Sequence, residues 1–260
     1  MKIITYSDLH LELEHGWYIP EDVDGDVLIL AGDIITFRNY RPLQQLLSDW
    51  KKPVIYIAGN HEYYTQKPLN QENEAFKQWL SNKLPQVSFL VDEAISIEGT
   101  HFFGGTMWTD FNHDTMAMMH AQSSMNDFRL IYSEEGRRLT PEHTIKLHEN
   151  FVTNLKNWLE RKLTGKRIII SHHAPIVNPN SQYKDSPLLP AFNSLDMIDI
   201  IKKYEPDCWI YGHTHECDEQ NIGKTKIISN QLGYPKRLGK YECLDFDSNG
   251  KTIKIFKDKK

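Results

Sequence analysis

Residues 54–62 read VIYIAGNHE, a stretch that joins an apolar run to three polar side chains. The β-branched and aromatic residues of the run are typical of a strand that is covered on both faces. Gly59 permits the sharp turn by which the chain leaves such a strand. A hydrophobic core has no use for Asn60, His61 and Glu62 at that point. The stretch therefore predicts a buried strand that ends at a functional site.

Four other apolar runs end in the same way. They lead into DLH at residues 8–10, GD at 32–33, HH at 172–173 and GHTH at 212–215. In an extended chain, the two-residue spacing of Asp8 and His10 places both side chains on the same side. Ligands of open α/β sheets bind beyond the carboxyl ends of parallel strands, so we expect the five ends to meet at one site.

The strand ends supply oxygen and imidazole donors and no cysteine. The donors are Asp8, His10, Asp33, Asn60, His172, His213 and His215, with His61 beside them. Such a set suits divalent Mn, Fe, Zn, Ni or Co better than a thiolate site would. Seven donors exceed what one tetrahedral ion needs. The sequence therefore predicts two metal ions, about 3.5 to 4 Å apart, that share a bridging carboxylate.

Composition and charge exclude several classes of protein. The chain has 260 residues, of which 40% are apolar, and this is enough for a substantial core. The net charge of −5 gives no general attraction to nucleic acid, so a duplex partner is disfavoured. Three cysteines argue against a disulfide framework and suggest a reducing compartment. The sequence shows neither a signal-peptide pattern nor a membrane span, so we expect a cytoplasmic protein without a membrane partner.

The rest of the sequence predicts further helices and strands from apolar periodicity and end signals. The helices are expected over residues 43–50, 71–84, 141–163 and 194–204, and the strands over 3–7, 26–31, 54–58, 87–91, 94–97, 101–104, 167–171, 207–211, 227–229, 241–245 and 252–256. The strands between residues 87 and 104 are expected to begin a second sheet. Residues 247–250, DSNG, are expected to join the last two strands as a hairpin.

Residues 106–135 mix bulky apolar and polar side chains without a clear period. This segment is expected either to form a lid or rim over the site or to fill irregular gaps with its methionines. In the long helix that Thr140 is expected to cap, His143 and His148 are expected to face solvent. The sequence contains no repeat and no linker, so residues 1–260 are expected to form a single domain.

The five motifs, in their order and spacing, resemble the signature of the calcineurin-like metallophosphoesterases over residues 8–215. The resemblance implies an α/β fold: a four-layer α/β/β/α sandwich of two mixed sheets flanked by helices, with a dinuclear metal centre. It implies that one metal ion is held by Asp8, His10, Asp33 and His215, and the other by Asp33, Asn60, His172 and His213. Asp33 would then bridge the two ions.

Such a centre implies hydrolysis of a small phosphomonoester or phosphodiester by in-line attack of a metal-bridging hydroxide. Asp33 and Asn60 would act there as catalytic ligands, and His61 would protonate the leaving group. Glu62 is expected to orient a histidine ring from behind the ligands. Tyr63, Trp108, Arg129 and His173 are expected to contact substrate, and Tyr64 and Phe111 are further candidates for stacking on a base.

The second motif narrows the substrate class. The family's protein phosphatases and symmetrical dinucleotide tetraphosphatases follow this aspartate with arginine, whereas Asp33 is followed by Ile34. The pattern is more similar to class III cyclic nucleotide phosphodiesterases and to uncharacterised bacterial or phage phosphohydrolases. Alternatives are a phosphodiesterase acting on cyclic nucleotides, a nuclease, and a non-catalytic metal-binding scaffold. The complete donor set disfavours the scaffold.

Overall fold

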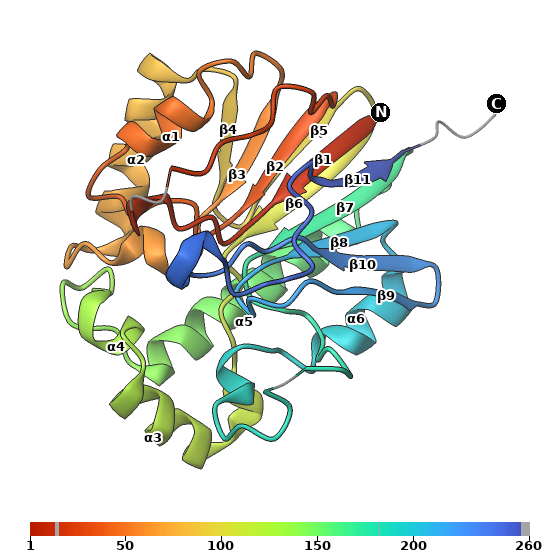
Figure 1. Cartoon of the computed structure of the whole chain (residues 1–260). Coiled ribbons are helices and arrows are strands. Elements are labelled where there is room, and N and C mark those ends of the chain that lie inside the picture. Colours follow the sequence, from red (N-terminus) through yellow and green to blue (C-terminus); the bar gives the residue numbers. More distant parts are fainter. Residues whose placement is uncertain (14–15, 182, 256–260) are drawn as a thin grey trace.

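The computed structural model describes residues 1–13, 16–181 and 183–255, and its strands form two mixed β-sheets (Figure 1). The first sheet has the order β11-β1-β2-β3-β4, formed by Lys251–Lys254, Lys2–Tyr6, Val27–Ala31, Val54–Ile57 and Val87–Leu90. The second has the order β5-β6-β7-β8-β10-β9, formed by Glu93–Ile97, Thr100–Gly105, Lys166–Ser171, Cys208–Tyr211, Thr225–Ser229 and Glu219–Ile222.

Parallel strands form the middle of both sheets. β1 to β4 run parallel in the first sheet, and β6, β7, β8 and β10 run parallel in the second. The outer strands β11, β5 and β9 pair antiparallel. The five polar motifs follow β1, β2, β3, β7 and β8, so each motif begins at the carboxyl end of a parallel strand.

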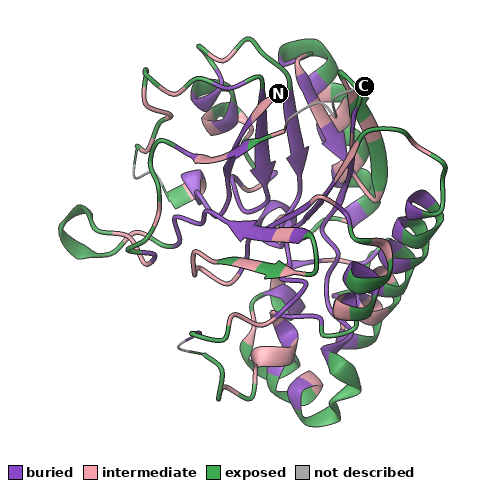
Figure 2. Cartoon of the chain, turned by 90° about the vertical axis from the view of Figure 1, so that its right-hand side faces the viewer, coloured by how far each residue is buried: buried purple, intermediate pink, exposed green. Residues whose placement is uncertain are grey.

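Three apolar clusters separate the layers. Along β3, Ile55 and Ile57 pack with Ile168 and other side chains in a cluster between the two sheets. The alternate residues Val54 and Tyr56 pack under the helices of the first sheet. Figure 2 shows most strands as buried and the helices as exposed on their outer side, whereas the edge strands β5 and β9 are largely exposed. Burial of each such side chain contributes about 1.5 to 3 kcal/mol to the stability of the folded state. Because β3 is covered by apolar side chains on both faces, the predicted α/β/β/α fold is confirmed.

Helices cover the outer face of each sheet (Figure 1). α1 (Arg41–Leu46) and α2 (Leu69–Lys83) pack on the first sheet. α5 (Pro141–Leu159) and α6 (Met197–Tyr204) pack on the second. The side chain of Thr140 caps α5 as expected, within a capping box that His143 completes. Among the described residues, no helix combines the length and apolar character needed to cross a membrane.

The strand β4 belongs to the first sheet, not to the second as predicted. It pairs parallel with β3, with Val87 opposite Val54 and Leu90 opposite Ile57. The 15-residue helix α2 between the two strands carries the chain back along the sheet, as a parallel pairing requires. Asp92, with φ of 55°, then turns the chain into β5 of the second sheet.

The predicted strand over residues 241–245 is wrong, although residues 247–250 do form a turn. Gly250 N donates to Asp247 O at 2.9 Å, and β11 then pairs with β1. Residues 241–245 instead lie along the loop that follows β10, where Cys243 N donates to Leu232 O at 3.2 Å. The edge strand β9, EQNI, was not predicted because it has no apolar pattern. Phe256, expected in the last strand, lies outside the described residues.

The segment 106–135 forms two short helices, α3 (Thr115–Ser124) and α4 (Asp127–Leu130). Phe111 and Phe128 pack into the outer cluster of the first sheet. His148 of α5 is buried here rather than facing solvent as expected. Its Nδ1 lies 3.2 Å from Met107 O and its Nε2 lies 3.3 Å from Asp196 Oδ2, so the ring joins three segments.

Candidate metal centre

Five of the seven predicted ligands have a left-handed backbone conformation. The angle φ is 54° at Asp8, 46° at His10, 54° at Asp33, 73° at His213 and 52° at His215. Residues with a Cβ adopt this conformation at a cost of order 1–3 kcal/mol each, and such strain clusters at functional sites. Hydrogen bonds between the loops hold these turns. Asp8 N donates to Gly32 O at 3.0 Å, and His10 N donates to Asp33 O at 2.9 Å.

Glu62 organises the backbone beneath the site. Its buried carboxylate accepts from the backbone N–H groups of Asp33 and Ile34, each at 2.9 Å, and of Gly59 at 2.7 Å. It also accepts from the hydroxyl of Tyr56 at 2.6 Å. The expectation that Glu62 orients a histidine ring is therefore corrected. Its carboxylate joins the turn after β2 to the turn after β3, and so places two ligand loops.

The first predicted ligand set, Asp8, His10, Asp33 and His215, meets at one point. The Nε2 atoms of His10 and His215 lie 3.1 Å apart, and His215 Nε2 lies 3.4 Å from Asp8 Oδ1. Asp33 Oδ2 lies 3.9 Å from His10 Nε2. Two imidazole nitrogens and two carboxylates thus point at a common space, which suits a divalent cation.

The second set meets around His172. Its Nε2 lies 3.3 Å from Asp33 Oδ1, 3.1 Å from Asn60 Oδ1 and 3.2 Å from His213 Nδ1. Asp33 is thus the residue common to both sets, with one carboxylate oxygen towards each. The arrangement corresponds to the bridging role that the family resemblance implies for Asp33.

The donor chemistry of the second set fits a cation. His172 Nδ1 lies 2.9 Å from the carbonyl oxygen of Ala31, which can only accept, so this nitrogen carries the hydrogen of the neutral ring. The lone pair of Nε2 then faces Asn60 Oδ1 and Asp33 Oδ1, which are also acceptors. Acceptors that converge without a hydrogen between them repel one another. A metal ion or a proton at this point removes the conflict.

Gly59 keeps the space between the ligands open. A Cβ at this position would collide with the carboxylate of Asp33 and lie 2.6 Å from His172 Nε2. Gly59, which ends the apolar run, therefore has a second role besides permitting the turn. It lets the backbone after β3 approach the two side chains closely enough for Asn60 to join them.

The charges of the site depend on one another because the groups are buried together. Burial opposes a charge on His172, but Asp33 outweighs this effect and raises the pKa to about 9. Burial also opposes a charge on His215, where Asp8 and Glu242 raise the pKa to about 10. Burial favours the neutral form of Asp33, yet His172 and other histidines hold its pKa well below the usual value. The carboxylates thus attract cations, and protons compete with metal ions for these rings.

Three acidic residues that the sequence reasoning missed support the ligands from behind. Glu242 Oε2 lies 2.5 Å from His215 Nδ1, and Glu12 Oε1 lies 3.3 Å from His10 Nδ1. Asp127 Oδ1 accepts from Asn60 Nδ2 at 2.9 Å, and this bond directs Asn60 Oδ1 towards His172. Carboxylates in such positions fix the orientation of metal ligands. The sequence offered a hint of only one of these three roles, because Glu12 lies two residues after His10.

Replacing Asp127 with alanine is expected to weaken metal binding at the second set by about 10- to 100-fold, because the amide of Asn60 loses its orienting acceptor. Titration of the metal-free protein with Mn²⁺, followed by calorimetry, measures the effect. Asp114→Ala removes the same charge from the N-cap of α3, outside the site. This control should lower stability by about 1 kcal/mol and leave the metal affinity unchanged. Equal affinity in wild type and the Asp127 variant would contradict the assigned role.

His61 lies beside the first ligand set but is not part of it. This position agrees with the sequence-based expectation. Its Nδ1 lies 2.9 Å from Glu12 Oε1, its Nε2 lies 2.8 Å from the hydroxyl of Tyr234, and Nε2 is 4.0 Å from Asp33 Oδ2. Burial opposes its charge, but Asp33 and Glu12 raise its pKa above the usual value. His61 is thus held by Glu12 in a form that can donate a proton from Nε2.

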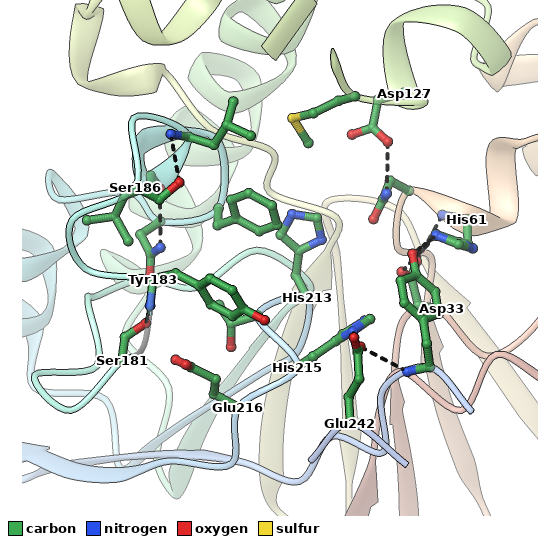
Figure 3. A pocket seen from close by; sticks show the side chains of 18 of the residues that line it. Asp33, His61, Asp127, Ser181, Tyr183, Ser186, His213, His215, Glu216 and Glu242 are labelled. Carbon is green, nitrogen blue, oxygen red and sulfur yellow. Dashed lines mark hydrogen bonds and ion pairs between the residues drawn. The ribbon is translucent and has the colours of Figure 1, made fainter. Parts of the chain in front are cut away.

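A cavity of about 480 Å³ opens over the metal centre, and Figure 3 shows its labelled side chains. Asp33, His61 and Asp127 lie on one side of it, and Ser181, Tyr183 and Ser186 lie on the other. Residues 124–127, which connect α3 to α4, line its edge. Part of the segment 106–135 therefore contributes a rim to the cavity, while most of its aromatic side chains lie in the core.

The four predicted substrate contacts do not line this cavity. Tyr63 and Trp108 stack on each other with ring centres 6.4 Å apart and line a different hollow beside α2 and α5. The guanidinium of the exposed Arg129 donates a hydrogen bond to Ser123 O, and Arg129 is not among the lining residues of the cavity. His173 is buried behind His213, where burial and His172 lower its pKa to about 3. Of the aromatic candidates, Tyr64 does reach the cavity.

Comparison with known proteins agrees with this fold. A protein of Acanthamoeba polyphaga mimivirus, described as uncharacterised, is 28% identical over 279 residues, which cover 95% of this chain and 98% of that protein. The UDP-2,3-diacylglucosamine hydrolase of Vibrio cholerae is 22% identical over 278 residues, covering 94% and 99%. The crystal structure of the phosphopantetheinyl hydrolase of Mycobacterium tuberculosis shares the fold, with a TM-score of 0.68 and 17% identity over 92% of this chain and 95% of that one.

Two sheets whose parallel strands end in a cluster of histidine and aspartate donors suit a metal-dependent hydrolase. The model of the calcineurin-like phosphoesterase family matches residues 1–217, and the chain belongs to that family. It is a metallophosphoesterase, an enzyme that hydrolyses phosphoric ester bonds. The resemblance that the five motifs indicate is thereby confirmed.

Proposed function

We propose that this enzyme hydrolyses a small phosphomonoester or phosphodiester with two divalent ions, and that His61 protonates the leaving group. One observation carries the proposal: two converging sets of donors share the single carboxylate of Asp33. Asp8, His10, Asp33 and His215 would hold one ion, and Asp33, Asn60, His172 and His213 the other. These nitrogen and oxygen donors suit Mn, Fe, Zn, Ni or Co.

The bound ions would supply a water of lowered pKa and neutralise negative charge on the phosphate. The chain's own residues fix the geometry. Glu242, Glu12 and Asp127 orient His215, His10 and Asn60. Because these side chains are already fixed before substrate arrives, little reorganisation is needed during the reaction.

A poor leaving group, such as an alkoxide, needs a proton when a phosphate ester is cleaved, and we propose that His61 gives this proton. Its ring lines the cavity, and Nε2 points to the hydroxyl of Tyr234, a neutral oxygen. We propose that the leaving oxygen of the substrate takes the position of this hydroxyl. Glu12 holds the ring through Nδ1 and favours the protonated form.

Turnover of bis-p-nitrophenyl phosphate and p-nitrophenyl phosphate tests the proposal. Protein stripped of metal should be inactive, and activity should return as Mn²⁺ is added until two ions are bound per chain. Saturation at two ions with no hydrolysis of either ester would contradict the proposed reaction. Saturation at one ion would contradict the dinuclear site. The ratio of the two rates distinguishes diester from monoester preference.

A further inference from the structure

The cavity over the metal centre is lined by several carboxylates and by histidines. Its described lining residues include Asp33, Asp127, Glu216 and Glu242, and none of them is a lysine or an arginine. Lys236 interacts with Glu242 electrostatically, but it is not among the lining residues. Among the described lining residues, the histidines alone can carry positive charge. Metal ions bound at the centre would add positive charge at the site of one phosphate.

The described residues that the segment 178–193 contributes to the lining are uncharged. The loop 178–193 places Ser181, Ser186 and Asn193 there, and Leu188 and Phe192 add apolar surface between them. Phe192 stacks on His213 with ring centres 4.7 Å apart, so this wall of the cavity continues directly from a predicted metal ligand. A substrate whose phosphate lies at the centre must place its remaining atoms against this wall.

We infer that the enzyme selects phosphate esters of an uncharged alcohol that carries hydroxyl or amide groups, and discriminates against substrates with a second phosphate. The inference rests on the proposed function. A volume of about 480 Å³ is that of a site for one small organic molecule. Hydroxyl and amide side chains can pair with neutral polar groups of the substrate. A second phosphate would instead meet the carboxylates of Glu216 and Glu242, and no lysine or arginine is among the described lining residues. Like charges in contact lower affinity.

Two matched substrates test the inference: thymidine 5′-(p-nitrophenyl phosphate) and the same compound with an added 3′-phosphate. Both release p-nitrophenol by the same bond cleavage, and they differ only in the second phosphate. At low salt and neutral pH, the kcat/KM of the enzyme saturated with Mn²⁺ should be at least about tenfold higher for the first compound. The difference should shrink as the salt concentration rises, because salt screens charges.

Two single-lysine variants show whether the cavity is the source of this discrimination. Ser124 lines the cavity at the end of α3, whereas its neighbour Ser123 does not, and both hydroxyls donate to His120 O. Ser124→Lys should reduce the preference about threefold, a typical effect of one partly exposed charge pair. Ser123→Lys, with the same charge change and the same lost bond, should leave the preference at its wild-type value.

Equal kcat/KM for the two compounds, or faster cleavage of the one with two phosphates, would overturn the inference and leave the proposed function standing. Equal changes in preference in both lysine variants would also overturn it, because the discrimination would then come from net charge and not from the cavity. If neither compound is hydrolysed with two Mn²⁺ ions bound, this inference is overturned. The proposed function fails only if bis-p-nitrophenyl phosphate and p-nitrophenyl phosphate also remain intact under the same conditions.

Discussion

Replacing Asp33 with asparagine is expected to lower turnover about 1000-fold and to reduce the bound metal from two ions per chain to one or none. Asp33 is the residue shared by both donor sets, with Oδ1 3.3 Å from His172 Nε2 and Oδ2 3.9 Å from His10 Nε2. Loss of the Asp33 charge weakens the attraction for a second cation. A second bound cation would contribute several kcal/mol of transition-state stabilisation. Elemental analysis and steady-state kinetics on bis-p-nitrophenyl phosphate measure the two effects.

The matched control is Asp92→Asn, which makes the same change at a half-buried carboxyl outside the centre. Burial, aided by Glu93, raises the pKa of Asp92 to about 7, so neutralising it costs the fold little. This variant should retain two ions and wild-type turnover. An Asp33 variant that still binds two ions and turns over at the wild-type rate would show that the sets do not depend on a shared carboxylate.

His61→Ala is expected to retain both metal ions and to lose about 10²- to 10⁴-fold in kcat on an ester with a poor leaving group. On p-nitrophenyl esters the loss should be much smaller, because p-nitrophenolate leaves without a proton. His61 lies 4.0 Å from Asp33 Oδ2 and beside Glu12, so the ring is near the reacting atoms without being needed as a ligand. Rates on phenyl phosphate and p-nitrophenyl phosphate, measured with metal content, separate the two roles.

The exposed His120→Ala serves as the control and should change neither rate nor metal content. Full turnover of the His61 variant on phenyl phosphate would rule out the acid role. An equal loss on both substrates, together with lost metal, would instead mark His61 as a ligand.

The fold and the donor groups could be predicted from the sequence because they share one local cause. A parallel strand buried on both faces must be apolar throughout, so a polar residue directly after it, such as Asp8 or His172, stands out. Strand ends of this kind converge wherever the strands are parallel, and no knowledge of distant contacts is needed. The layers follow from the same apolar runs, such as 54–57.

The supporting residues could not be predicted because their roles depend on contacts between distant segments. Asp127 accepts a hydrogen bond from Asn60, which lies 67 residues away in the sequence. The carboxylate of Glu242 contacts the ring of His215, which lies 27 residues away. Glu62 lies next to a ligand motif, yet it binds backbone amides that appear only after two loops come together. Trp108 was predicted at the substrate because aromatic residues suit both cores and binding sites, and here packing with Tyr63 determines its position.

The left-handed backbone at Asp8, His10, Asp33, His213 and His215 implies a trade-off between stability and activity. Glycine adopts that conformation without steric cost, so at these five positions the predicted metal ligand is also a poor choice for folding. A descendant of this chain that no longer needed to hydrolyse esters would gain stability by losing these side chains. The five residues therefore lower the stability of the fold, and the proposed metal chemistry of the centre would explain why they are present.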